Sequence, residues 1–169
     1  MDKMPLAAVV CQSFPESVLL FALGLTLMGA PLRWRRIIFA AVIYTAISCF
    51  VRSLPLPYGI HTITGLVVMC ALFIVFFRSP LQLAATASLL SILTLGVLEI
   101  LFYPLVLATG LSIKEIWARP LLRILIPFPE LISLGIITWW CAKKKITFTS
   151  SRPFQQKAEE EKQNRGHQS

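Results

Sequence analysis

Five long apolar runs, almost free of charged residues, follow one another along the chain. They cover residues 17–32, 37–51, 62–77, 81–109 and 121–142. A helix that crosses a bilayer needs about 20 mainly apolar residues. With their flanks included, we expect spans at about 14–32, 36–53, 62–77, 81–109 and 121–142. The pattern predicts an all-α fold, a polytopic membrane bundle of about five transmembrane helices, in which the long fourth span is tilted or bent at Pro104.

The composition agrees with a bilayer environment. Hydrophobic residues make up 56% of the 169 residues, charged residues only 14%, and the mean hydropathy is +0.74. Soluble domains carry about 25% charged residues, and disordered chains have low hydrophobicity. Five spans would use most of the chain. We therefore expect a transmembrane domain over residues 1–145, a disordered polar cytoplasmic tail over residues 146–169, and no soluble enzyme domain.

The basic residues are distributed like those that flank membrane spans. Although the net charge is +8, Arg33, Arg35 and Arg36 and then residues 143–145 form short clusters between apolar runs. With five spans and the N-terminus outside, 11 basic residues lie inside and 5 outside. Cytoplasmic loops carry an excess of Lys and Arg. This bias predicts a plasma-membrane protein with an outer N-terminus and a cytoplasmic C-terminus, and it argues against nucleic-acid binding.

Two loop segments are expected at the outer surface. Residues 4–13 either lie at the interface or begin a longer first helix. In residues 111–120, Ser112 and Glu115 have capping-box spacing and Ile113, Ile116 and Trp117 share one helical face. This pattern is typical of a short helix lying on the membrane.

No motif for catalysis or metal binding stands out. The cysteines at 11, 49, 70 and 141 form no Cys-x-x-Cys pair and each lies in an apolar stretch, so they are expected to pack as small hydrophobic residues. His61 and Cys70 are the residue types of a cysteine peptidase. However, nine residues at about 100° each put them on opposite helix faces. We expect no catalytic residue, no metal and no cofactor.

Six polar or ionisable residues at the edges of or within the runs are the candidate site. An ionisable group deep in a membrane is costly and usually has a partner or a hydrated cavity. All six are expected in the outer half of the bundle, as a ligand pocket or a proton or ion relay. They are Glu16, Arg52, His61, Glu99, Arg123 and Glu130.

A structural role is the alternative for these residues. Glu16 and Glu130 each follow a proline, and Pro followed by an acidic residue is common in the first turn of a helix. Both belong to a Phe-Pro-Glu triplet, residues 14–16 and 128–130, expected at the start of two helices of the same orientation, a pattern that duplication would also produce. Glu99 has no such capping role to explain it, which leaves it open between a functional and a structural role.

The segment between the second and third runs carries a family resemblance. Residues 52–62 read Arg-x-Leu-Pro-x-Pro-aromatic-Gly-x-His-Thr, and residues 111–123 contain Leu-Ser-x-x-Glu-Ile and then Pro-Leu-Leu-Arg. Over about residues 14–142 the chain resembles the membrane-embedded N-terminal sensor region of Gram-positive, Firmicutes-type sensor histidine kinases of the GHKL and Spo0B-like type. The resemblance implies a polytopic domain that senses a signal and passes it to a kinase core.

The chain departs from that family after Lys145. No phospho-accepting histidine helix and no Gly-rich ATP lid follow, and His167 lies in the polar tail. We therefore expect a non-enzymatic bacterial membrane protein, a stand-alone sensor-type domain that binds a signal in its outer half. It would act through a kinase or a like subunit as partner. The alternative is a small substrate-binding membrane subunit of a vitamin or metabolite transporter.

Overall fold

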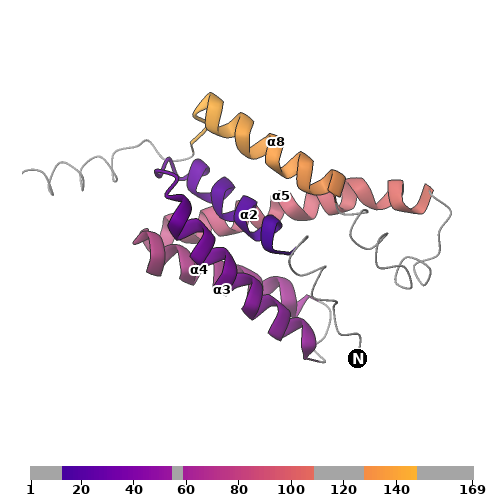
Figure 1. The fold of residues 1–169 in the computed structure, drawn as a ribbon, viewed down its shortest axis with the longest axis horizontal. Helices are drawn as coiled ribbons and strands as arrows, with labels where there is room; N and C mark the ends of the chain where they lie inside the picture. The colour runs from indigo at the N-terminus through magenta and orange to yellow at the C-terminus, as the bar shows by residue number, and fades with distance from the viewer. Residues whose placement is uncertain (1–12, 55–58, 109–127, 148–169) are drawn as a thin grey trace, which may run out of the picture.

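The computed structural model describes residues 13–54, 59–108 and 128–147 (Figure 1), without the side chains of residues 52, 53 and 105–108. Within these ranges the chain is all-helical. The helices are α2 (Phe14–Leu27), α3 (Trp34–Ser53), α4 (Ile60–Phe77), α5 (Leu81–Ala108) and α8 (Phe128–Lys144). Each begins within three residues of an expected span, except α8. The expected start of that span, at residue 121, lies outside the described residues.

The end of α2 corrects one expected boundary. The first span was expected to reach residue 32, whereas the helix ends at Leu27. Gly29 adopts a left-handed conformation with φ 68°, and its amide donates to the Thr26 carbonyl at 3.0 Å. Pro31 follows and cannot continue a helix. Residues 28–32 are apolar and therefore lengthen the apolar run in the sequence, but Gly29 and Pro31 make them a turn and not a helix.

The helices form a bundle in which α2 lies at the centre. It packs against α3, α5 and α8, while α4 packs against α3 and α5 (Figure 1). Neighbours in sequence run antiparallel, and α2 and α8 run parallel. Their starts meet where Glu16 and Glu130 line one small space. At their other ends, a side chain built at Gly29 would lie 3.2 Å from Thr147.

The core is built around α2. From Leu20 to Leu27 every residue of this helix is buried. The Phe21 ring meets the rings of Tyr44 on α3 and Phe73 on α4 edge-on, with centroids 5.8 and 5.1 Å apart. Gly24 lets α4 and α5 approach, because a Cβ there would lie 2.5 Å from Phe73 and 3.1 Å from Ser91. Small residues at helix contacts are the usual means of close packing in membranes.

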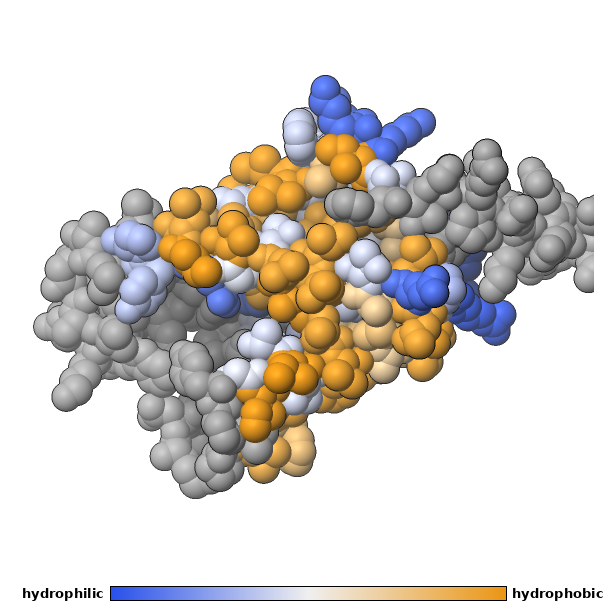
Figure 2. Space-filling model, turned by 180° about the vertical axis from the view of Figure 1, so that it is seen from behind, coloured by the Kyte–Doolittle hydropathy of each residue, from blue (hydrophilic) through white to orange (hydrophobic). Residues whose placement is uncertain are grey.

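The outward faces of the surrounding helices are strongly apolar. Side chains such as Val75 and Ile100 are 69% and 76% exposed, and apolar groups cover most of the described surface between the two ends on the face that Figure 2 shows. Among the described residues, three helices are long and apolar enough to cross a membrane, with candidate spans at Trp34–Val51, Ile60–Phe77 and Leu81–Pro104. An exposed apolar surface of this extent is typical of contact with lipid or with other membrane helices.

Several hydroxyl groups inside the helices bond to their own helix, whereas the buried Ser91 hydroxyl of α5 has no partner among the described atoms. Thr26, Thr94 and Thr138 each donate to the carbonyl oxygen four residues earlier, all at 2.8 Å. Ser88 does the same at 2.7 Å. Such bonds let a polar side chain sit in a helix where no water reaches it. The described helices therefore suit a solvent that offers few hydrogen bonds.

The charged side chains that the structure describes are divided between the two ends of the bundle. At the basic end, where α2, α4 and α8 finish, lie all the lysine and arginine side chains that the structure describes (Figure 2): Arg33, Arg35, Arg36, Arg78, Lys143, Lys144 and Lys145. The three described carboxylates, Glu16, Glu99 and Glu130, lie at the other end, which we call the carboxylate end. Arg36 joins α3 to α4 at the basic end, because its Nη1 donates to the Phe76 carbonyl at 3.2 Å.

Several predicted features lie outside the described residues. These are the interfacial segment 4–13, the loop prolines at 55 and 57, the surface helix over 111–120, Arg123 and the polar tail beyond residue 147. The backbone of α5 continues as helix through Pro104 to Ala108.

Candidate functional site: a polar cavity at the carboxylate end

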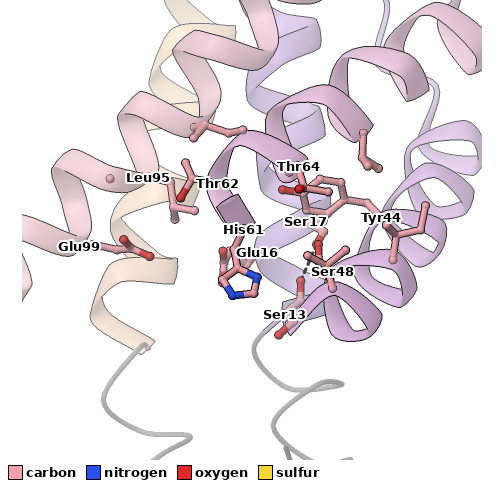
Figure 3. A pocket seen from close by; sticks show the side chains of 16 residues that line it. Ser13, Glu16, Ser17, Tyr44, Ser48, His61, Thr62, Thr64, Leu95 and Glu99 are labelled. Carbon is pink, nitrogen blue, oxygen red and sulfur yellow. Dashed lines mark hydrogen bonds between the residues drawn. The ribbon is translucent and has the colours of Figure 1, made fainter. Parts of the chain in front are cut away.

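A cavity of about 270 Å³ opens between α2, α3, α4 and α5 at the carboxylate end. Its polar lining contrasts with the apolar outward faces of the helices between the two ends of the bundle. Ionisable groups, hydroxyls and two glycines face it together with apolar side chains (Figure 3). The lining residues are Ser13, Glu16, Ser17, Tyr44, Ile47, Ser48, Val51, His61, Thr62, Thr64, Gly65, Val68, Ile92, Leu95, Gly96 and Glu99.

The first turn of α2 supplies Glu16 and Ser17. Pro15 is in the first turn of the helix, where its fixed φ and missing N–H are tolerated. Glu16 follows it in the same turn, where the helix dipole stabilises an acidic side chain. The Ser17 hydroxyl donates to the Ser13 carbonyl at 2.6 Å and lies 3.0 Å from Thr45 Oγ1 on α3. This pair of hydroxyls fixes the start of α2 against α3 beside the cavity.

Tyr44 of α3 lines the cavity at the point where α4 comes closest. A Cβ at Gly65 would lie 2.9 Å from the Tyr44 hydroxyl oxygen. Gly65 therefore leaves the space that the tyrosine occupies. Because the Tyr44 ring also packs edge-on against Phe21, the wall of the cavity is continuous with the core.

His61 enters the cavity from the first turn of α4. Gly59 precedes it with φ 99°, a left-handed conformation that favours glycine, and its carbonyl accepts from the amides of Thr62 and Ile63, both at 3.2 Å. The ring is half-buried. Its Nδ1 atom is buried and has no hydrogen-bond partner in the described part of the protein.

Glu99 faces the cavity from α5. In Figure 3 its carboxylate extends toward the side on which His61 and Glu16 lie. The side chain is exposed at the rim of the cavity. One turn earlier along α5, a Cβ at Gly96 would meet no atom within 4 Å. The absent side chain at Gly96 thus contributes open space to the cavity.

Glu130 lies beside the cavity and does not line it. It shares a smaller space with Glu16, Leu95, Leu131 and Leu134. Three carboxylates from α2, α5 and α8 therefore gather at one end of the bundle. No group of three His, Cys, Asp or Glu side chains among the described residues is arranged to hold a metal ion.

The structure places four of the six predicted site residues near one another. Glu16, His61 and Glu99 line the cavity and Glu130 adjoins it. The side chains of Arg52 and Arg123 lie outside the described part of the chain. Cys70, which would be the nucleophile of a peptidase with His61, is not among the residues that line the cavity.

The hydroxyl residues and glycines of the lining were not predicted. Ser48 lies four residues after Tyr44, Thr62 directly follows His61, and Thr64 lies three residues after His61. The sequence signal that could have indicated these lining residues was the helical spacing of polar residues near the end of an apolar run. The two Phe-Pro-Glu triplets do open α2 and α8, and these two helices are parallel neighbours.

Comparison of the chain with protein-family models, with curated proteins and with solved structures found no match.

Proposed function

We propose that the chain is a non-enzymatic multi-pass protein of a bacterial plasma membrane, with α2, α3, α4, α5 and α8 as its five spans. The basic end faces the cytoplasm, in keeping with the excess of Lys and Arg in cytoplasmic flanks. The carboxylate end, with the polar cavity, then opens in the outer half of the bilayer. The protein is a stand-alone sensor-type domain that binds a signal there.

The polar cavity is the observation that carries this proposal. A lipid-embedded bundle gains little from placing Glu16, His61 and Glu99 around an open space, because ionisable groups in the membrane are costly. Binding sites combine concave apolar walls with a few convergent polar groups. The lining has both, with Leu95 and Val68 as examples of the apolar part.

The output passes through a partner protein. Because the cavity is lined by four helices, an occupant that contacts all four alters how they pack. A ligand shifts a conformational equilibrium by its difference in affinity for the two states. A kinase or a like subunit that contacts the helices or the cytoplasmic side would read this shift.

Purification in mild detergent, followed by mass spectrometry of bound proteins and small molecules, tests the proposal. The control variant is Gly96→Phe, which fills open space in the cavity and meets no neighbouring atom at its Cβ. We expect the wild type to retain a small molecule that the variant loses, together with a kinase or like subunit. An ATPase module in place of the kinase would support the transporter alternative. Equal small-molecule content in the two proteins would contradict ligand binding in the cavity.

A further inference from the structure

We propose that the ligand of the polar cavity is a small organic cation, a protonated primary amine carried on a compact apolar body. The inference rests on the proposed function, since it names the chemical class of the occupant of the same cavity. It is drawn from the sign of the charges at the cavity, from the hydrogen-bonding groups inside it and from its size.

The charged side chains that the structure describes at the cavity are carboxylates. Glu16 and Glu99 line it and Glu130 adjoins it, whereas every described lysine and arginine side chain lies at the opposite end of the bundle. Low-dielectric walls focus such a field and raise the local concentration of the oppositely charged ligand. Among the described side chains, nothing at this end neutralises Glu99 by an ion pair at hydrogen-bond distance. A cationic ligand would do so.

The lining offers acceptors to an ammonium group. An ammonium has three N–H donors and no acceptor. The buried Nδ1 of His61 has no partner among the described atoms, and it accepts when the ring carries its proton on Nε2. The Glu99 carboxylate and the hydroxyls of Thr62 and Thr64 are further acceptors. A buried polar atom without a partner is unfavourable, so an N–H donor from the ligand improves the site.

The size of the cavity favours an organic body. Sites for drug-sized ligands have volumes of about 300–1,000 Å³, and this cavity, at about 270 Å³, is slightly smaller. Ile47, Val51, Val68, Ile92 and Leu95 provide apolar walls. A quaternary ammonium is usually held by a cage of Trp, Tyr or Phe rings, whereas Tyr44 is the one residue of these three types in the described lining. The lining therefore fits a primary amine better.

Three probes of similar shape and different charge test this inference: isopentylamine, isopentanol and 4-methylpentanoate. Their binding to the full chain in lipid nanodiscs is measured by calorimetry, with empty nanodiscs as blank. We expect the amine to bind at least about ten-fold more tightly than the alcohol, the ratio that loss of one hydrogen bond to a charged group produces. Glu99→Gln should remove this preference. Glu159→Gln, the same change in the polar tail, should retain it.

The outcomes separate the inference from the proposed function. Equal affinity for amine and alcohol, or preference for the carboxylate, would overturn the inference and leave a binding cavity in place. Tightest binding of the carboxylate would indicate that Arg52 or Arg123 sets the charge of the site. If no probe binds, a molecule retained from the cell extract decides: a cation supports the inference, and a neutral or anionic molecule overturns it. If the extract also yields nothing, both proposals fail. Should Glu99→Gln fail to fold, the comparison of the three probes on the wild type still decides.

Discussion

At the residue scale, two glycines of the same helix bundle have opposite surroundings. Gly24 lies at the centre, where α4 and α5 approach α2, and Gly96 borders the cavity. A methyl group added at Gly24 would meet Phe73, whose ring is fully buried and held between Phe21 and Phe77. At Gly96 the same methyl group would enter open space. Substituting alanine for each of these two glycines therefore compares a tightly packed position with an open one.

We predict that Gly24→Ala destabilises the protein by about 1–3 kcal/mol, the usual range for overpacking a well-packed core. Gly96→Ala should stabilise the helix or leave it unchanged, by up to about 1 kcal/mol, because alanine is the better helix former. Reversible unfolding in detergent, with both variants compared to the wild type, is the measurement. Equal effects of the two substitutions would show that the α2–α4–α5 contact is not packed as described.

At the element scale, the join between α2 and α3 beside the cavity depends on a hydroxyl pair. Ser17 Oγ and Thr45 Oγ1 are 3.0 Å apart and buried, and this is a hydrogen bond between two helices. In contrast, Thr138 on α8 bonds to its own helix. We therefore expect the stability effects of substitutions at Ser17 and Thr45 to be coupled, and those at Ser17 and Thr138 to be independent.

We expect a double-mutant cycle of Ser17→Ala and Thr45→Val to give a coupling energy of about 0.6 kcal/mol, with an upper limit of about 1.7 kcal/mol, as found for hydrogen bonds between membrane helices. The matched control combines Ser17→Ala with Thr138→Val and should be additive within about 0.5 kcal/mol. Additivity in the Ser17–Thr45 cycle would mean that this bond does not join the two helices.

The helices could be predicted from the sequence, but their neighbours could not. Charged residues and prolines at the ends of the apolar runs placed α3, α4 and α5 within a few residues. The end of α2 was missed because residues 28–32 are apolar and their turn depends on Gly29. Glu16, His61 and Glu99 were found because charge in an apolar run is conspicuous. Ser48, Thr64 and Gly65 were missed because no apolar stripe distinguishes the faces of these helices, so the sequence does not indicate which face borders a cavity.

At the scale of the whole molecule, the separation of charge between the two ends predicts an orientation. Trp34 at the start of α3 and Lys144 at the end of α8 lie at the basic end. Ile60 begins α4 at the carboxylate end and is exposed. Because cytoplasmic flanks carry an excess of basic residues, we expect the basic end to face the cytoplasm.

Single cysteines at these positions, in a protein whose native cysteines have been replaced, test this orientation in intact cells. Trp34→Cys and Lys144→Cys should resist a membrane-impermeant thiol reagent until the cells are opened, and Ile60→Cys should react at once. Labelling of position 34 and not of position 144 from outside would be incompatible with parallel α2 and α8.

The central place of α2 also has a consequence for how the protein is made. In the order of synthesis α2 precedes the other described helices, yet its surface is covered by α3, α5 and α8, the last of which ends only at Lys144. The described α2 has 14 residues, about 21 Å at 1.5 Å per residue, which is shorter than a hydrocarbon core of about 30 Å. Its enclosure is therefore complete only once α8 has been made and has packed against it. Until α8 is made, the face of α2 that packs against α8 stays uncovered. A chain whose synthesis stops before α8 would therefore expose this face.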